Sequence, residues 1–233
     1  MTTPTLATSC AALPPEGAVP LWGGPAAEPT PARATSCPEL PVPLGGSPAR
    51  TLLRPALNFP PELLLKAQGI RVVFFDVDGV MTDGGLYITQ AGETVKRFHT
   101  LDGHGLKLLK RAGITPAVIT GRDSKPLRLR LAALGIDQVH YGTEEKYQAA
   151  EQTLKTLGLA WQQAAAMGDD WPDLALMRRC ALACAPHNAH PEVRAVSHHV
   201  TSARGGDGAV REFCDLLLVA SGKYADLLEE SAR

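Results

Sequence analysis

Residues 70–80 have the sequence IRVVFFDVDGV, in which an apolar run of β-branched and aromatic side chains ends in Asp76 and Asp78. A short, continuous apolar run of this kind predicts a strand that is buried on both faces of a parallel sheet. Ligands of open α/β sheets bind just beyond the carboxyl ends of the strands, so the two aspartates are expected at a functional edge. Because side chains alternate along an extended chain, both carboxylates should point to one side and Val77 to the other.

The pair of aspartates brings two negative charges close together. Such carboxylates repel each other unless a cation lies between them. Asp76 and Asp78 therefore predict a metal site that also contains a candidate carboxylate nucleophile.

The composition argues against several classes of protein. The chain has 233 residues, of which 45% are hydrophobic, and its formal net charge is -1. This balance gives no reason to expect a nucleic-acid or anionic-membrane partner. No apolar stretch approaches the ~20 residues that span a bilayer. Five cysteines without a disulfide-like spacing favour a reducing compartment, and we expect a cytoplasmic protein.

The first 57 residues differ in composition from the rest. They hold 12 of the 19 prolines and no lysine, and they show neither helical nor strand periodicity. Such a segment cannot bury enough apolar surface to offset its ordering entropy. We therefore expect residues 1–57 to form a disordered Pro/Ala-rich extension and residues 58–233 to form the folded domain. The extension could be a docking tail or the product of an upstream start assignment, and the sequence leaves both open.

From residue 58 onward, predicted strands and helices alternate. Apolar runs predict five strands, over 70–75, 115–120, 136–141, 164–167 and 181–185. Helical spacing and end signals predict six helices, over 60–67, 105–112, 124–134, 146–157, 174–179 and 210–220. A glycine-containing turn between two strand-like runs predicts a β-hairpin at about 86–98. Alternation in units of this size predicts a three-layer, doubly wound, Rossmann-like α/β fold with a parallel sheet.

Polar residues follow several of these predicted strands. Besides Asp76 and Asp78, they are Thr120, Lys146 and the group Asp169, Asp170 and Asp173. Each signal alone is weak, because aspartates are common in turns, threonines cap helices, and most lysines are solvated. Their occurrence in this order at successive strand ends indicates one composite site.

These four motifs, in this order, resemble those of the haloacid dehalogenase superfamily of aspartate-nucleophile phosphohydrolases over residues 70–173. Within that superfamily the chain is similar to the 3-deoxy-D-manno-octulosonate 8-phosphate phosphatases over residues 58–228. The matching segments are DVDGVMTDG (76–84), FHTLDGHG (98–105), ITGR (119–122) and GGDGAVRE (205–212).

The resemblance implies a role for each motif residue. Asp76 would be the nucleophile that forms an aspartyl-phosphate, and it is already ionised at neutral pH. Asp78 would protonate the leaving alkoxide and then deprotonate the attacking water. Thr120 and Lys146 would bind the transferring phosphoryl oxygens.

The family pattern also implies a Mg²⁺ cofactor, which suits hard oxygen ligands. Its ligands would be the carboxylates of Asp76 and Asp169 and the backbone carbonyl of Asp78. Asp170 and Asp173 would support those ligands.

By the same resemblance, the substrate is a small sugar acid phosphate. Its contacts, besides Asp78 and Lys146, would be His99, Thr100, Leu101, Asp102, Gly103, Lys107, Arg122 and Arg130. The two arginines would offer planar guanidinium groups to carboxylate and phosphate, although Arg130 could equally be a solvated helix residue. His99 and Leu101 stand where relatives carry amide or basic side chains, which leaves the sugar less well defined than the phosphatase chemistry. Arg204 and Arg211 flank a glycine-rich segment of the tail (203–233) that could form a lid or simply be solvated.

The chain has no room for the cap domain of the larger superfamily members, and only the hairpin stands in its place. The resemblance implies a homotetramer in which hairpins pair across subunits and a neighbour helps to cover the site. The hairpin's apolar residues agree with this: Leu86, Tyr87, Ile88, Val95 and Phe98. The alternative is that the hairpin folds back on its own domain.

The implied activity is Mg²⁺-dependent hydrolysis of 3-deoxy-D-manno-octulosonate 8-phosphate, a step in lipopolysaccharide precursor synthesis. The same chemistry on another sugar acid phosphate, such as N-acylneuraminate 9-phosphate, is one alternative. A catalytically idle oligomerisation module is another, although the joint presence of Asp76, Asp78, Lys146 and Asp169 argues against it. A mutase is disfavoured, because it would need a cap to keep water from its intermediate.

Overall fold

A computed structural model describes residues 53–90 and 92–233 of the chain. The predicted extension therefore lies outside the described residues, except for its last five. Within the described residues, no helix is both long and apolar enough to cross a membrane.

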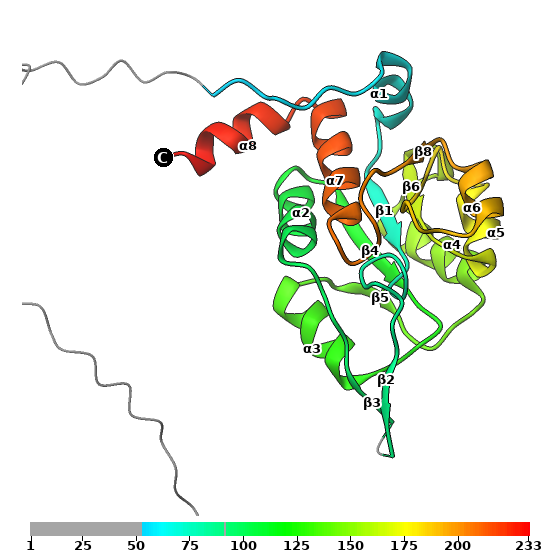
Figure 1. Ribbon diagram of the computed structural model, residues 1–233. Coiled ribbons are helices and arrows are strands. Elements are labelled where there is room, and N and C mark those ends of the chain that lie inside the picture. Colours follow the sequence, from blue (N-terminus) through cyan, green and yellow to red (C-terminus); the bar gives the residue numbers. More distant parts are fainter. Residues whose placement is uncertain (1–52, 91) are drawn as a thin grey trace, which may run out of the picture. The chain divides into compact units, whose positions relative to one another are not determined.

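The centre of the domain is a six-stranded parallel sheet with the strand order β5-β4-β1-β6-β7-β8 (Figure 1). Its strands are β1 (Val72–Phe75), β4 (Thr115–Ile119), β5 (Gln138–His140), β6 (Ala164–Met167), β7 (Leu182–Ala185) and β8 (His199–Val200). This architecture confirms the predicted three-layer, doubly wound α/β fold.

Helices cover both faces of the sheet (Figure 1). The core on one face includes residues of α1 (Pro61–Ala67), α2 (Thr100–Arg111), α3 (Lys125–Leu134), α7 (Ala209–Ala220) and α8 (Tyr224–Ser231). The core on the other face includes residues of α4 (Lys146–Leu157), α5 (Leu174–Met177) and α6 (Pro191–Val196). Two short 3₁₀ turns, Trp161–Gln163 and Trp171–Asp173, precede β6 and α5.

Strand β1 separates these two cores. Val73 and Phe75 belong to one core, and Val72 and Phe74 belong to the other. All four side chains are at most 1% exposed. Burying a side chain of this size contributes about 1.5–3 kcal/mol. The apolar run before Asp76 is thus a strand buried on both faces, as its sequence predicts.

The connections place a crevice at the carboxyl end of β1. From β1 the chain crosses through α2 to β4 on one side, and from β5 it returns through α4 to β6 on the other side of β1. The strand order therefore reverses beside β1. Open α/β sheets bind ligands at such a switch point, where diverging loops leave room.

Several predicted boundaries were wrong. Helix α2 begins at Thr100 and not at Gly105, and both Gly103 and Gly105 lie inside it. A Cβ on Gly103 would lie 2.2 Å from Arg130 Nη2, and one on Gly105 would lie 3.1 Å from Cys214 Sγ, so close packing explains these glycines. Helix α6, strand β8 and helix α8 were not predicted.

The predicted hairpin is formed by β2 (Tyr87–Thr89) and β3 (Gly92–Val95), which pair antiparallel and extend away from the sheet (Figure 1). Its apolar residues divide into two groups. Phe98 packs against the core to which α3 contributes, and the Arg130 guanidinium lies 5.8 Å from the Phe98 ring centroid. Leu86, Tyr87, Ile88 and Val95 are exposed within the described chain.

Candidate active site

Asp76 and Asp78 lie in the loop that follows β1. The Asp76 amide donates a hydrogen bond to the Met167 carbonyl (3.1 Å), which continues the pairing of β1 with β6. Both aspartates line the same pocket, whereas Val77 is fully buried in the core. The predicted separation of the two carboxylates from Val77 is therefore confirmed.

Lys146 lies between two carboxylates at the carboxyl edge of the sheet. It is the first residue of α4, and its side chain is 5% exposed. Its Nζ lies 2.9 Å from Asp76 Oδ1 and 2.7 Å from Asp173 Oδ1. A buried ammonium held between two carboxylates is a fixed positive charge beside the candidate nucleophile.

Thr120 and Arg122 belong to the loop after β4. The Thr120 amide donates to the His140 carbonyl and its own carbonyl accepts from Thr143 (both 3.0 Å), so the backbone here is held rigidly. Thr120 Oγ1 accepts from the Arg122 amide at 3.2 Å. The Arg122 Nε lies 3.7 Å from Asp78 Oδ2, and the side chain is half-exposed at the pocket.

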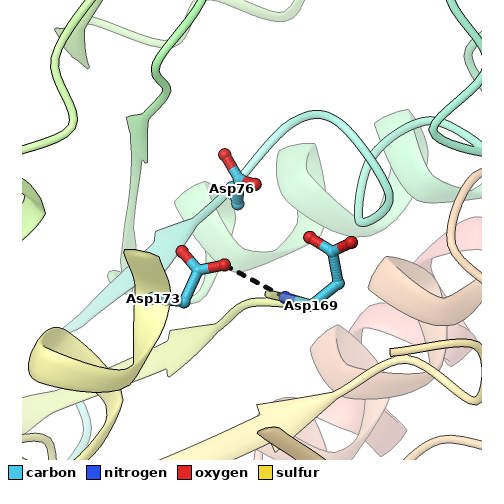
Figure 2. A group of neighbouring side chains, drawn as sticks. All are labelled: Asp76, Asp169 and Asp173. Atoms are coloured by element: carbon cyan, nitrogen blue, oxygen red, sulfur yellow. Dashed lines mark hydrogen bonds between the residues drawn. The ribbon is translucent and has the colours of Figure 1, made fainter. Parts of the chain in front are cut away.

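Asp169 and Asp173 face Asp76 from the loop after β6 (Figure 2). One carboxylate oxygen from each of the three lies within 4.8 Å of the others. Asp173 Oδ2 accepts from the amides of Asp169 (3.1 Å) and Asp170 (3.3 Å), while its Oδ1 accepts from Lys146. Both oxygens of Asp173 are therefore engaged, and its carboxylate orders the loop.

Asp169 differs from Asp173, because its Oδ1 is buried and has no hydrogen-bond partner. An unpartnered buried carboxylate oxygen is costly unless a cation binds it. Asp76 and Asp169 thus fit a hard divalent cation as ligands, and Asp173 fits a supporting role.

The carboxyl groups have raised pKa values in the absence of a cation. Burial raises the pKa of Asp169 to about 8, and the charges of Asp76 and Asp173 add to the effect. Burial and the Asp173 charge raise the pKa of Asp76 to about 6, against the lowering influence of Lys146. A bound cation would favour the charged forms and oppose both shifts.

The pocket has an excess of negative charge. Two cationic side chains line it, Arg122 and Lys146, against six carboxylates: Asp76, Asp78, Glu144, Asp169, Asp170 and Asp173. Thr120, Gly121 and Pro172 complete the lining. A phosphate monoester would be repelled by this set alone, so the charges also favour a divalent cation in the site.

Comparison with known proteins places this chain in a family. A family model described as haloacid dehalogenase-like hydrolase matches residues 136–213. The 3-deoxy-D-manno-octulosonate 8-phosphate phosphatase of Salmonella typhimurium is 40% identical over 171 residues, covering 73% of this chain and 91% of that protein. The chain belongs to the 3-deoxy-D-manno-octulosonate 8-phosphate phosphatase family.

Solved structures agree with membership of this phosphatase family. The enzyme of Moraxella catarrhalis, crystallised with magnesium, phosphate and a KDO molecule, is 37% identical with a TM-score of 0.70, covering 72% of this chain and 96% of that chain. A probable YrbI family phosphatase of Pseudomonas syringae is 41% identical with a TM-score of 0.72, covering 74% and 98%.

Most of the residues that the family resemblance assigns to the sugar lie outside the pocket that holds the carboxylates. Most of them form the start of α2 and do not line the pocket of their own chain, as far as the structure describes it. Asp102 is buried, and its Oδ1 accepts from the Arg211 amide (2.8 Å) in the first turn of α7. Arg130 donates to the His99 carbonyl (3.2 Å), whereas Thr100, Leu101 and Lys107 are exposed. Of the two arginines assigned to the substrate, Arg122 lines the pocket and Arg130 does not.

The glycine-rich segment 205–208 rests on the loop after Asp78. The Gly206 amide donates to the Val80 carbonyl at 3.1 Å. A Cβ on Gly205 would lie 1.7 Å from the Gly79 carbonyl oxygen. Arg211, which follows this segment, donates to Asp215 within α7. The segment thus packs on the active-site loop in this structure.

Two charged residues at the site were not predicted from the sequence. Glu144 lines the pocket two residues before Lys146, so its closeness to that motif was an available signal. Lys96 follows the hairpin and its Nζ contacts Asp78 Oδ1. Nothing local in the sequence distinguishes Lys96 from the neighbouring Arg97, because its burial depends on tertiary packing.

Proposed function

We propose that this protein is a cytoplasmic phosphoric monoester hydrolase that converts 3-deoxy-D-manno-octulosonate 8-phosphate and water into 3-deoxy-D-manno-octulosonate and phosphate. The step would supply lipopolysaccharide precursor synthesis. The observation that carries the proposal is the Lys146–Asp76 ion pair at the switch-point crevice, beside the Asp169 carboxylate, whose buried Oδ1 has no hydrogen-bond partner. Its family membership and the magnesium and KDO in the Moraxella catarrhalis crystal support the choice of substrate.

Asp76 is the proposed nucleophile. Its carboxylate attacks phosphorus, the bond to the sugar oxygen breaks, and Asp78 gives a proton to the departing alkoxide. Water then attacks the aspartyl-phosphate while Asp78 takes up its proton, which releases phosphate and restores both side chains. This division replaces one difficult displacement by two easier ones.

The remaining pocket residues bind and orient the phosphoryl group. Thr120 and Lys146 are the proposed donors to its oxygens, with Lys146 offsetting charge as it develops. Asp76, Asp169 and the Asp78 carbonyl would hold Mg²⁺, with Asp170 and Asp173 in support. When bound, the ion would supply positive charge that neutralises the carboxylates and the phosphoryl oxygens.

The sugar acid is assigned to Arg122 within the pocket. The segment around the start of α2 is proposed to complete the sugar site through a neighbouring subunit of a homotetramer, together with Lys107 and Arg130. The residues of that segment are His99, Thr100, Leu101, Asp102 and Gly103. The exposed apolar residues Leu86, Tyr87, Ile88 and Val95 support hairpin pairing in such an assembly.

Phosphate release tests the proposal. The substrates are 3-deoxy-D-manno-octulosonate 8-phosphate, N-acylneuraminate 9-phosphate and a panel of other sugar phosphates, each with Mg²⁺ and with EDTA. We expect selective, Mg²⁺-dependent release from the first substrate and none from the Asp76→Asn variant. Preference for the neuraminate would replace the named substrate. No release from any substrate, by folded protein with Mg²⁺, would favour the idle module.

A further inference from the structure

Lys96 is a buried cation that contacts the loop after β1. It follows directly on β3, at the base of the hairpin, and its side chain is 0% exposed. Its Nζ contacts Asp78 Oδ1, but Lys96 does not belong to the pocket lining, as far as the chain is described. Lys96 therefore reaches Asp78 from the base of the hairpin and not from the residues that line the pocket.

The two oxygens of Asp78 consequently have different surroundings. Oδ1 is held by the buried Lys96 ammonium, while Oδ2 lies 3.7 Å from Nε of the half-exposed Arg122, which lines the pocket. A buried ammonium requires a partner, and a charged hydrogen bond of this kind fixes the rotation of the carboxylate. Asp78 is thereby held with Oδ2 toward the pocket.

We propose that Lys96 is a positioning residue for Asp78, holding Oδ1 so that Oδ2 is the oxygen that exchanges a proton with the leaving group. This role rests on the proposed function, to which it adds a residue that lies outside the four motifs. The proton on Oδ2 passes to the sugar oxygen as the phosphorus–oxygen bond breaks and the bond from phosphorus to Asp76 forms.

The dependence of kcat/KM on the leaving group distinguishes positioning of the acid Asp78 from a role of Lys96 in the site as a whole. The alkoxide of a sugar is a poor leaving group and needs the acid, whereas p-nitrophenolate leaves without one. The ratio kcat/KM reports steps up to departure of the leaving group, so it isolates the acid's contribution. General acid catalysis contributes typically 10²–10⁴-fold. Loss of positioning should therefore affect the sugar phosphate far more than the aryl phosphate.

The experiment measures kcat/KM of Lys96→Met on the sugar phosphate and on p-nitrophenyl phosphate at saturating Mg²⁺. We expect about a 100-fold loss on the sugar phosphate and less than about a threefold change on the aryl phosphate. Arg97→Met is the matched control, because Arg97 is the adjacent cation but pairs with Asp207 and Asp83. It should change neither value. Equal losses on both substrates by Lys96→Met, or no loss on either, would overturn the proposal.

A double-mutant cycle with Asp78→Asn adds a second readout. Because Lys96 acts through Asp78, its substitution should cause no further loss in the Asp78→Asn background. Lys96→Gln serves in both measurements if the methionine variant does not fold, and circular dichroism checks the fold of each. Additive losses would contradict the positioning role. Failure of the wild type on the named sugar alone would overturn only the substrate, because any other alkyl phosphate that it hydrolyses can take its place in the comparison.

Discussion

Gly79 lies against the Asp169 carboxylate, with no room for a methyl group between them. A Cβ on Gly79 would lie 2.1 Å from Asp169 Oδ2, and the residue has a φ of +88°. Gly168 has a similar constraint, since its Cβ would lie 2.3 Å from that of Asp173. At the scale of single residues, the carboxylates hold their positions because two neighbouring residues have no side chain.

Gly79→Ala should therefore displace the Asp169 carboxylate. We expect loss of Mg²⁺-induced thermal stabilisation and about a 100-fold loss of phosphatase activity, comparable to losing a group that stabilises transition-state charge. Gly84→Ala is the matched control, because Gly84 also has a positive φ (+80°) but a Cβ there would meet nothing closer than 3.6 Å. It should cost about 1–2 kcal/mol of backbone strain and leave Mg²⁺ binding intact. Retention of Mg²⁺ stabilisation in Gly79→Ala would contradict this account.

Site residues that directly follow strands could be predicted from the sequence. Site residues that are positioned by tertiary packing could not be predicted as well. Asp76, Asp78, Thr120, Lys146 and Asp169 could be predicted, because the carboxyl ends of parallel strands meet at one edge. All of them line one pocket. Lys96 could not, since only the folded hairpin brings it into contact with Asp78.

At the scale of elements, the hairpin has more exposed apolar surface than a monomer needs. Ile88 is 67% exposed on β2, and Leu86, Tyr87 and Val95 are exposed around it. Such a patch favours association. The base of the same hairpin carries Lys96, so assembly and chemistry share one element.

Ile88→Asp should dissociate the proposed homotetramer. A charge on each hairpin would face its copies across the interface, where it would be desolvated. Leu65→Asp is the control, because Leu65 is also 67% exposed but lies on α1. We expect light scattering after gel filtration to give a smaller species for Ile88→Asp and an unchanged mass for Leu65→Asp. An assembly that survives in the hairpin variant would show that other surfaces hold the subunits together.

Short elements and element ends were the least predictable part of the fold. Strand β8 has two residues and α6 has six, too few for a periodic pattern to register. Helix α2 was predicted to begin too late because glycine disfavours helices. Its two glycines instead allow α2 to lie close to α3 and α7, a gain in packing that exceeds their low propensity.

At the scale of the whole molecule, the carboxylate cluster makes folding stability depend on pH and on metal. The folded pKa values of about 6 for Asp76 and about 8 for Asp169 exceed the ordinary value of an aspartate side chain, 3.8. At pH values between about 4 and about 8, the folded protein binds more protons than the unfolded chain. Stability without metal should therefore fall as pH rises from about 4 to about 8.

Thermal melts at pH 6.0 and pH 8.5 test this linkage. In EDTA we expect a lower Tm at the higher pH, and the gain in Tm from Mg²⁺ should be larger there because fewer protons compete for the ligands. Asp169→Asn, which cannot ionise, should weaken both effects. A Tm in EDTA that rises between these pH values, with the same slope in the variant, would contradict the assignment.

The central position of β1 has a consequence for synthesis of the chain. Asp76 and Asp169 are 93 residues apart, yet their strands β1 and β6 are neighbours in the sheet. A nascent chain that has emerged only as far as β5 can pair β1 with β4 and β4 with β5, which already brings Asp76, Asp78 and Thr120 to one edge. It still lacks the other half of the cation site, and closing so long a loop is a slow step. Ion capture during synthesis would thus have to wait until β6 has emerged and paired with β1.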